Sequence, residues 1–276
     1  MTASSNHPAL KAVSPQAPVT DWFRGDDRHH NGAFTLLQTT NFLPRLEGRH
    51  MGKGVMNQIV KNDVYTDFLA LGTFKNVDDL VRDTTQTLWN DIKNHPDFDD
   101  FWKERDARTS CYNLKPAILV VGGLYDSEDC YGAWNLYKAI KEQSPDTDLY
   151  LTFGPWWHGA WTVRGFQGFG NLYFGKALQL ITWTNRISFF RYFLEGKGEK
   201  PKHKVNIFHT GENEWKHTTN GLYKRLPVHL IIYIKTDQYP HKHRQNKSLI
   251  LNIFQICHVR YPIRQTLPLT GQKNSW

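Results

Sequence analysis

The chain has 276 residues, of which 39% are hydrophobic and 14% aromatic. This composition is sufficient for a folded core and argues against wholesale disorder. Its mean hydropathy is -0.57, and no run approaches the ~20 apolar residues that a membrane-spanning helix needs. The formal net charge is +8, but no acidic residue follows Asp237, so the basicity belongs mainly to the tail. Three cysteines without a Cys-x-x-Cys pair argue against a disulfide framework or a structural zinc site.

The first hundred residues predict one short strand and then helices. An apolar stretch around Leu10 to Val13 is typical of a strand, and prolines end it. The polar, aromatic segment from Asp21 to Ala33 (DWFRGDDRHHNGA) predicts a loop. Asn76 to Asn94 has the apolar spacing of a helix, with Asn76 as its expected N-cap, and a second short helix is expected around Phe98 to Trp102.

The next hundred residues alternate between predicted strands and helices. Pro116 to Gly122 (PAILVVG) is a continuous branched apolar run, which is typical of a strand buried on both faces of a parallel sheet. We expect a helix to about Glu142, then a strand from Asp148 to Phe153, a helix from Leu178 to Glu195 and a strand from Val205 to Phe208. This order predicts a parallel α/β sheet, with the helical stretch before it forming a lid.

Two of these strands end in loops with reactive side chains. GGLYDSED carries Asp126, Glu128 and Asp129, and GPWWHG carries His158 one strand-helix-strand unit later. Ligands bind at the carboxyl ends of parallel strands, and an acid followed by a histidine is the order of the α/β-hydrolase triad. In the alternative interpretation Asp126 caps the following helix, Asp129 is its capping-box acid, and His158 is structural.

Four segments together resemble the X-Pro dipeptidyl-peptidase S15 family, including its cocaine-esterase, glutaryl-cephalosporin-acylase and α-amino acid ester hydrolase relatives. They are HPALKAVSPQAPVTDWFRGDDRHHNGAF (7–34), VGGLYDSEDCYGAW (121–134), FGPWWHGAW (153–161) and FHTGENEW (208–215). The resemblance implies an α/β-hydrolase fold in which Asp126 is the triad acid and His158 the triad base. It also implies that Asp27, Glu128 and Asp129 bind the α-ammonium group of the substrate; otherwise they are solvated loop and cap residues.

The nucleophile of such a triad is not apparent in the sequence. No serine stands in a Gly-x-Ser-x-Gly turn, and in the family that turn lies shortly before the segment matching His7. We therefore expect an N-terminally incomplete α/β-hydrolase core formed by residues 1–31 and 109–215, with an inserted helical cap at residues 32–108. Residues 216–276 would be an atypical basic tail in place of the family's C-terminal β-sandwich, best explained by a frameshift.

By resemblance, the expected function is serine hydrolysis, through an acyl-enzyme, of amide or ester bonds in substrates with a free α-amino group. The expected partner is a small-molecule or peptide substrate, with no metal, organic cofactor, nucleic acid or membrane involved. One alternative is a catalytically dead, truncated or frameshifted remnant of such an enzyme. The other is a basic nucleic-acid-binding protein, whose affinity would be strongly salt-dependent and would be lost on deleting the residues after Asp237.

Overall fold

The computed structural model describes residues 2–47, 63–78, 86–175 and 177–219. The described residues all belong to one compact unit, which lies within Met1–Lys224. Residues 220–276 of the expected basic tail lie outside them. No helix in the described ranges has the length and apolar character needed to span a membrane.

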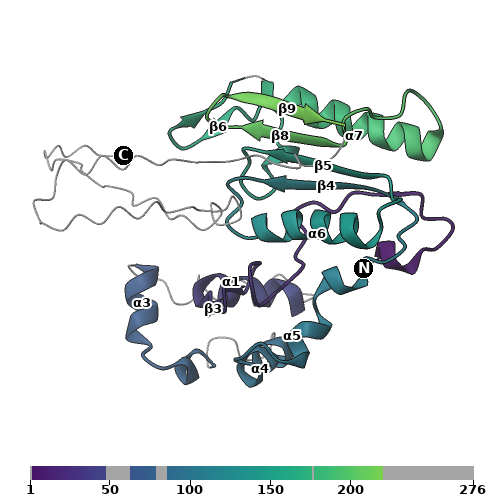
Figure 1. Ribbon diagram of the computed structural model, residues 1–276. Coiled ribbons are helices and arrows are strands. Elements are labelled where there is room, and N and C mark those ends of the chain that lie inside the picture. Colours follow the sequence, from purple (N-terminus) through teal and green to yellow (C-terminus); the bar gives the residue numbers. More distant parts are fainter. Residues whose placement is uncertain (1, 48–62, 79–85, 176, 220–276) are drawn as a thin grey trace, which may run out of the picture. The chain divides into compact units, whose positions relative to one another are not determined.

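A five-stranded sheet forms the centre of this unit, with the strand order β1-β4-β5-β8-β9. Its strands are β1 (Ala12–Val13), β4 (Ala117–Gly123), β5 (Leu149–Gly154), β8 (Val205–His209) and β9 (Glu214–Thr218). The first four pair in parallel, as predicted, and β9 is antiparallel to β8. Figure 1 shows β4, β5, β8 and β9 side by side. Every residue of β4 and β5 is buried, which explains why both strands lack polar alternation.

Helices cover both faces of the sheet (Figure 1): α6 (Cys130–Gln143) on one and α7 (Ala177–Glu195) on the other. Alternate residues of β4 enter the two cores, because successive side chains of a strand point to opposite faces. Ile118 and Val120 belong to the cluster that contains α6 residues, whereas Leu119 and Val121 belong to the cluster that contains α7 residues. The sheet is therefore fully sandwiched at its centre, and β4 and β5 form a rigid base for the loops that follow them.

The segment between β1 and β4 is mainly helical in its described residues. A hairpin of β2 (His29–His30) and β3 (Ala33–Phe34) precedes α1 (Leu36–Glu47), α3 (Val64–Ala70), α4 (Gln86–Asn94) and α5 (Asp100–Glu104). These elements have a core of their own that does not draw on the sheet. Its buried members are Phe23, Val77, Trp89, Ile92 and Trp102.

The helix predicted from Asn76 to Asn94 is wrong at its start. Asn76 lies inside a short 3-10 helix, η2 (Phe74–Val77), and its side chain donates to the Leu71 carbonyl at 2.5 Å. Asp78 follows as the C-cap of η2, and its carboxylate accepts from Trp89 Nε1 at 2.6 Å. Hydrogen bonds with Leu71 and Trp89 thus occupy the polar side chains that would otherwise cap a helix. The helix α4 itself runs from Gln86 to Asn94.

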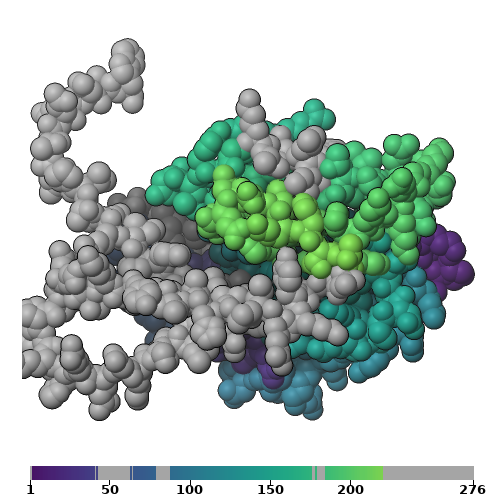
Figure 2. All heavy atoms as spheres, turned by 45° about the horizontal axis from the view of Figure 1, so that its top comes forward, coloured from purple at the N-terminus to yellow at the C-terminus, as the bar shows by residue number. Residues whose placement is uncertain are grey.

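The remaining elements are short and were not predicted. They are the 3-10 helices η1 (Thr2–Ser5), η3 (Ala107–Ser110) and η4 (Ala160–Thr162), and the hairpin of β6 (Gly168–Phe169) with β7 (Leu172–Tyr173). The edge strand β9 was also missed. Its residues are exposed or half-buried, and in the space-filling view of Figure 2 they lie on the surface in yellow-green.

Candidate active site

The loops after β4 and β5 are bound to each other through their backbones. Leu124 N–H donates to the Gly154 carbonyl at 2.8 Å, and Tyr125 N–H donates to the Trp156 carbonyl at 3.0 Å. The approach is so close that a Cβ at Gly123 would lie 2.3 Å from the Trp156 oxygen, so this position requires glycine. These contacts place the residues that follow, Asp126 and His158, at the same edge of the sheet.

The Asp126 carboxylate is buried and uses its two oxygens for different purposes. Oδ1 accepts the backbone N–H groups of Glu128 at 2.9 Å and Asp129 at 3.1 Å, whereas Oδ2 lies 3.0 Å from His158 Nδ1. The capping-box interpretation is wrong, because α6 begins at Cys130 with Asp129 as its N-cap, and Asp129 makes no side-chain cap hydrogen bond. Asp126 instead orders its own loop and directs one oxygen at the imidazole.

His158 presents its other ring nitrogen away from this carboxylate. With Nδ1–H donating to Asp126, Nε2 is the acceptor nitrogen of the neutral ring. The side chain is 46% exposed, so the ring is accessible. Its pKa is raised to about 9, chiefly by the hydrogen bond to Asp126, with the charges of Asp126, Glu128 and Asp129 acting in the same direction against partial burial. Trp156, two residues earlier in the chain, is fully buried.

The carboxylates of Asp27, Glu128 and Asp129 form a second group, which we call the carboxylate trio. Each contributes an oxygen, and these oxygens all lie within 4.8 Å of one another. Asp27 and Asp129 are buried, and Asp27 adopts a left-handed backbone with φ of 43°. Burial is the largest cause that raises all three pKa values, and that of Asp129 reaches about 9. Oxygens at this spacing could hold an ammonium group or a metal ion, and exposed acidic groups are common without either.

Sequence reasoning missed Arg28, which lies beside the carboxylate trio. Its side chain is fully buried, and its three guanidinium nitrogens have no hydrogen-bond partner among the described residues. The guanidinium instead sits 5.3 Å from the Trp22 ring and 4.9 Å from the Phe42 ring. It faces the charges of the trio and opposes the rise in the pKa of Asp27. The position of Arg28 directly after Asp27 in RGDDRHH is the sequence feature that could have predicted its place beside the carboxylate trio.

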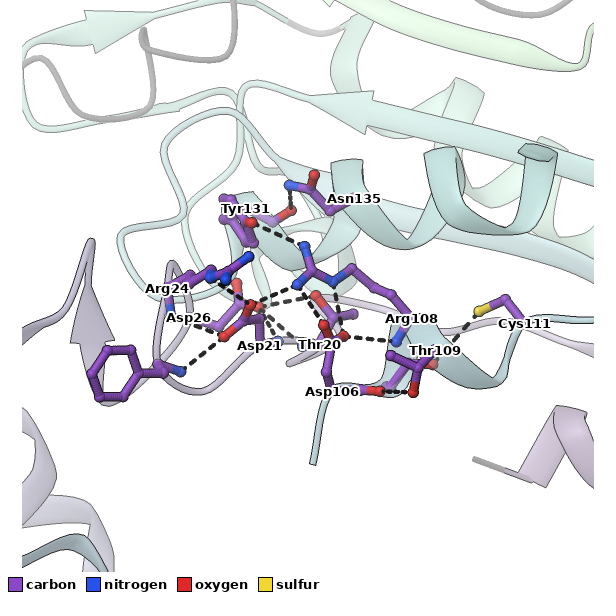
Figure 3. A network of polar contacts seen from close by, with 12 residues as sticks. Thr20, Asp21, Arg24, Asp26, Asp106, Arg108, Thr109, Cys111, Tyr131 and Asn135 are labelled. Atoms are coloured by element: carbon purple, nitrogen blue, oxygen red, sulfur yellow. Dashed lines mark hydrogen bonds and ion pairs between the residues drawn. The ribbon is translucent and has the colours of Figure 1, made fainter. Parts of the chain in front are cut away.

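A polar network holds the loop that carries Asp27 against α6 (Figure 3). The Asp26 carboxylate accepts backbone N–H groups from Thr20 at 2.9 Å, Asp21 at 3.2 Å and Gly132 at 2.7 Å. Arg108 forms ion pairs with Asp21 and Asp106, each at 2.6 Å, and donates to the Tyr131 hydroxyl at 2.9 Å. The position of Asp27 relative to Glu128 and Asp129 thus depends on contacts across about a hundred residues of sequence.

The structure therefore brings together all five side chains that the sequence singled out: Asp126 with His158, and Asp27 with Glu128 and Asp129. The two groups share one member. Asp129 belongs to the carboxylate trio, and its Oδ2 also lies 3.5 Å from His158 Nδ1. The arrangement offers a ring nitrogen able to exchange a proton, an acid that orients the ring, and an anionic site next to it.

Comparisons with known proteins agree with this arrangement. Residues 1–160 match the family model of the X-Pro dipeptidyl-peptidases (S15 family). An aminopeptidase from the marine sediment archaeon Thaumarchaeota archaeon superposes with a TM-score of 0.67 at 28% identity, covering 78% of this chain and 35% of that one. A selenomethionine-labelled α-amino acid ester hydrolase gives a TM-score of 0.68 at 28% identity, covering 79% of this chain and 36% of that one. No curated protein matches.

The chain thus spans about a third of the length of these two solved structures. The parallel sheet with helices on both faces, together with these matches, establishes a fold of the α/β-hydrolase type. The division into core, cap and tail at residues 31/32, 108/109 and 215/216 stays a prediction.

Proposed function

The chain belongs to the X-Pro dipeptidyl-peptidase family (S15), and from that membership we propose that it supplies the acid–base pair and the amine-binding group of a hydrolase. The bonds cleaved are amides or esters in substrates with a free α-amino group. The observation that supports this most is the 3.0 Å contact between Asp126 Oδ2 and His158 Nδ1, beside three further carboxylates. His158 is the proton-transfer residue, and Asp126 is the residue that orients it.

In this mechanism Asp126 holds the Nδ1–H tautomer and stabilises the imidazolium that forms. His158 Nε2 takes the proton of a hydroxyl nucleophile as that oxygen attacks the scissile carbonyl. It then gives the proton to the leaving amine or alcohol, and a water deprotonated in the same way releases the acyl group. The resemblance makes this nucleophile a serine, but none of the chain's serines occupies a Gly-x-Ser-x-Gly turn.

The carboxylate trio would bind the α-ammonium group. Three carboxylates held close together repel one another, and a bound cation relieves that repulsion. An ammonium group also brings three N–H donors, one for each carboxylate, and charge-assisted hydrogen bonds of this kind are strong. Arg28 supplies a fixed positive charge nearby, which offsets part of the cost of ionising the two buried acids, Asp27 and Asp129.

A second candidate function is supported by the missing motif: the chain binds amine-bearing ligands but forms no acyl-enzyme. Removing the nucleophile of such a triad costs several orders of magnitude in rate, even where the other residues remain. The two candidates differ in chemistry but share the same binding site. A turnover assay therefore distinguishes the two candidate functions, whereas a binding assay does not.

The test is a rapid-mixing assay of the 276-residue chain with the p-nitrophenyl ester of L-alanine and with its N-acetyl derivative. A working hydrolase gives a burst of p-nitrophenol with the free amine only, abolished by His158→Ala. Asp146→Asn, a substitution at an exposed site, should leave the burst intact. Hydrolysis at the background rate, unchanged by His158→Ala, would refute catalysis by this chain and support the binding-only candidate.

A further inference from the structure

Asp129 is placed where it can act on both parts of the site. Its oxygens lie within 4.8 Å of ligand atoms in two groups, Asp126 with His158 and Asp27 with Glu128. One oxygen, Oδ2, is 3.5 Å from His158 Nδ1. The other, Oδ1, is buried without a hydrogen-bond partner in the part of the chain that the structure describes, and the side chain is 3% exposed. A buried carboxylate with a free oxygen requires a proton or a nearby cation.

The charged groups around the imidazole come from two loops. Asp126, Glu128 and Asp129 face it from the loop after β4, and Asp27 faces it from the loop before β2. Arg28, on that same loop, faces the carboxylate trio and so counteracts it. The His158 imidazolium carries a removable proton and acts on Asp27, Glu128 and Asp129 alike, whereas His30 acts on Asp27.

We propose that Asp129 couples the two parts of the site, so that an ammonium ligand bound by the carboxylate trio releases the proton of His158. This inference rests on the proposed amine-binding role of the trio. Before binding, the acids hold His158 in its protonated form. The ligand's positive charge replaces the imidazolium as their counter-ion, the Nε2 proton passes to solvent, and Nδ1–H stays on Asp126. One cation is bound and one proton is released, so the charge balances.

The consequence concerns the base required by the mechanism. A histidine whose pKa is about 9 is protonated at neutral pH and cannot accept a proton. If ligand binding lowers that pKa, the neutral base is generated only when an amine is in place. A neighbouring like charge lowers a histidine pKa by roughly 1 to 3. By reciprocity, deprotonation of His158 strengthens amine binding. As pH rises through the titration of His158, the affinity should increase roughly 10-fold for each unit by which the bound amine lowers the His158 pKa.

The experiment is an NMR titration of the His158 ring from about pH 5 to about pH 10 on the 276-residue chain. The probe is n-propylammonium, which remains charged over most of that range and carries no reactive bond. The matched neutral probe is n-propanol, and potassium chloride keeps the ionic strength constant. The variant that removes the coupling is Asp129→Asn; Asp146→Asn is the equivalent change at an exposed position.

We expect saturating propylammonium to lower the His158 pKa by at least about 1 in the wild type and in Asp146→Asn. Propanol should leave it unchanged, and Asp129→Asn should lose most of the effect. If Asp129→Asn does not fold, as judged by circular dichroism, Glu128→Gln serves instead. This variant should bind propylammonium more weakly but should still show the fall of the His158 pKa at saturating ligand.

The outcomes separate this inference from the proposed function. Propylammonium that binds without moving the His158 pKa refutes the coupling and leaves the amine site standing. An equal fall in Asp129→Asn would assign the effect to general electrostatics and refute the role of Asp129. Failure of propylammonium to bind at any pH refutes both the amine site and the coupling.

Discussion

Replacing Asp126 by asparagine should change both the charge and the tautomer of His158. The asparagine carbonyl can keep the two backbone hydrogen bonds that Asp126 Oδ1 accepts from Glu128 and Asp129. Its NH₂ group then faces His158 Nδ1, which must become an acceptor, so the proton moves to Nε2. The ring nitrogen required as a base would no longer be free in the neutral state.

The magnitude follows from the contributions to the His158 pKa, which lies at about 9 against an ordinary value of 6.5. The hydrogen bond to Asp126 is the largest cause, and the charge of Asp126 adds to it, but Glu128 and Asp129 remain in the variant. We therefore expect Asp126→Asn to lower this pKa by roughly 1 to 2, which would leave it above the ordinary value of 6.5. In the wild type, the folded-state value exceeds the unfolded one. The pair's stabilisation is therefore fully present below about pH 6.5 and is lost as pH rises through about 9.

The assay is a pH titration of the His158 Cε1–H and ring ¹⁵N resonances, which report the pKa and the tautomer separately. Glu142→Gln, an exposed acid-to-amide change on α6, is the control and should move neither. A His158 pKa in Asp126→Asn that stays within a few tenths of the wild-type value would refute the reasoning. So would an unchanged tautomer, because the 3.0 Å contact would then not determine the position of the proton.

Three further predictions concern the frame that holds the site. Gly132→Ala would place a Cβ 1.9 Å from a backbone carbonyl oxygen and 2.7 Å from Asp26 Oδ2. Chemical unfolding should therefore show a loss of about 2 kcal/mol or more in the free energy of unfolding. The control Gly211→Ala, which has open space around the new Cβ, should be nearly neutral. Arg108→Gln removes the 2.6 Å ion pair of the buried Asp21 carboxylate, whose other cation, Arg24, lies 3.9 Å away, and should cost about 3 kcal/mol; urea unfolding that shows no loss of stability would contradict this. Burial raises the Asp26 pKa to about 6, so its contribution to stability should be greatest below about pH 4 and decline as pH rises through about 6; in Asp26→Asn this part of the pH dependence should be absent.

Where sequence reasoning succeeded, the information was local. The run from Pro116 to Gly122 is apolar throughout because β4 is buried on both faces, so its burial and parallel pairing could be predicted from composition alone. The order of strands then placed the loops carrying Asp126 and His158 at the same edge. The roles of these residues came from resemblance to a family and not from spacing.

Where it failed, the decisive contacts were distant in sequence, or were local contacts that leave no pattern in the sequence. Asp26 is bound to Gly132 across 106 residues, and Asp21 to Arg108 across 87, so no local pattern could show that they fix the loop holding Asp27. Asn76 looked like an N-cap because its side chain was assumed to be available for the helix, but the Leu71 carbonyl takes it. The two-residue strands β6 and β7 are too short to carry any periodic signal.

The most direct test of the account is whether a free amine is recognised next to His158. Isothermal titration calorimetry at neutral pH would compare L-alaninamide with N-acetyl-L-alaninamide on the wild-type chain and on Asp27→Asn, with the His158 resonances followed in parallel. The account predicts at least about 10-fold tighter binding of the free amine, loss of that preference in Asp27→Asn, and a change at the His158 ring on binding. Equal affinity for both compounds, or a preference that survives Asp27→Asn without any change at His158, would contradict it.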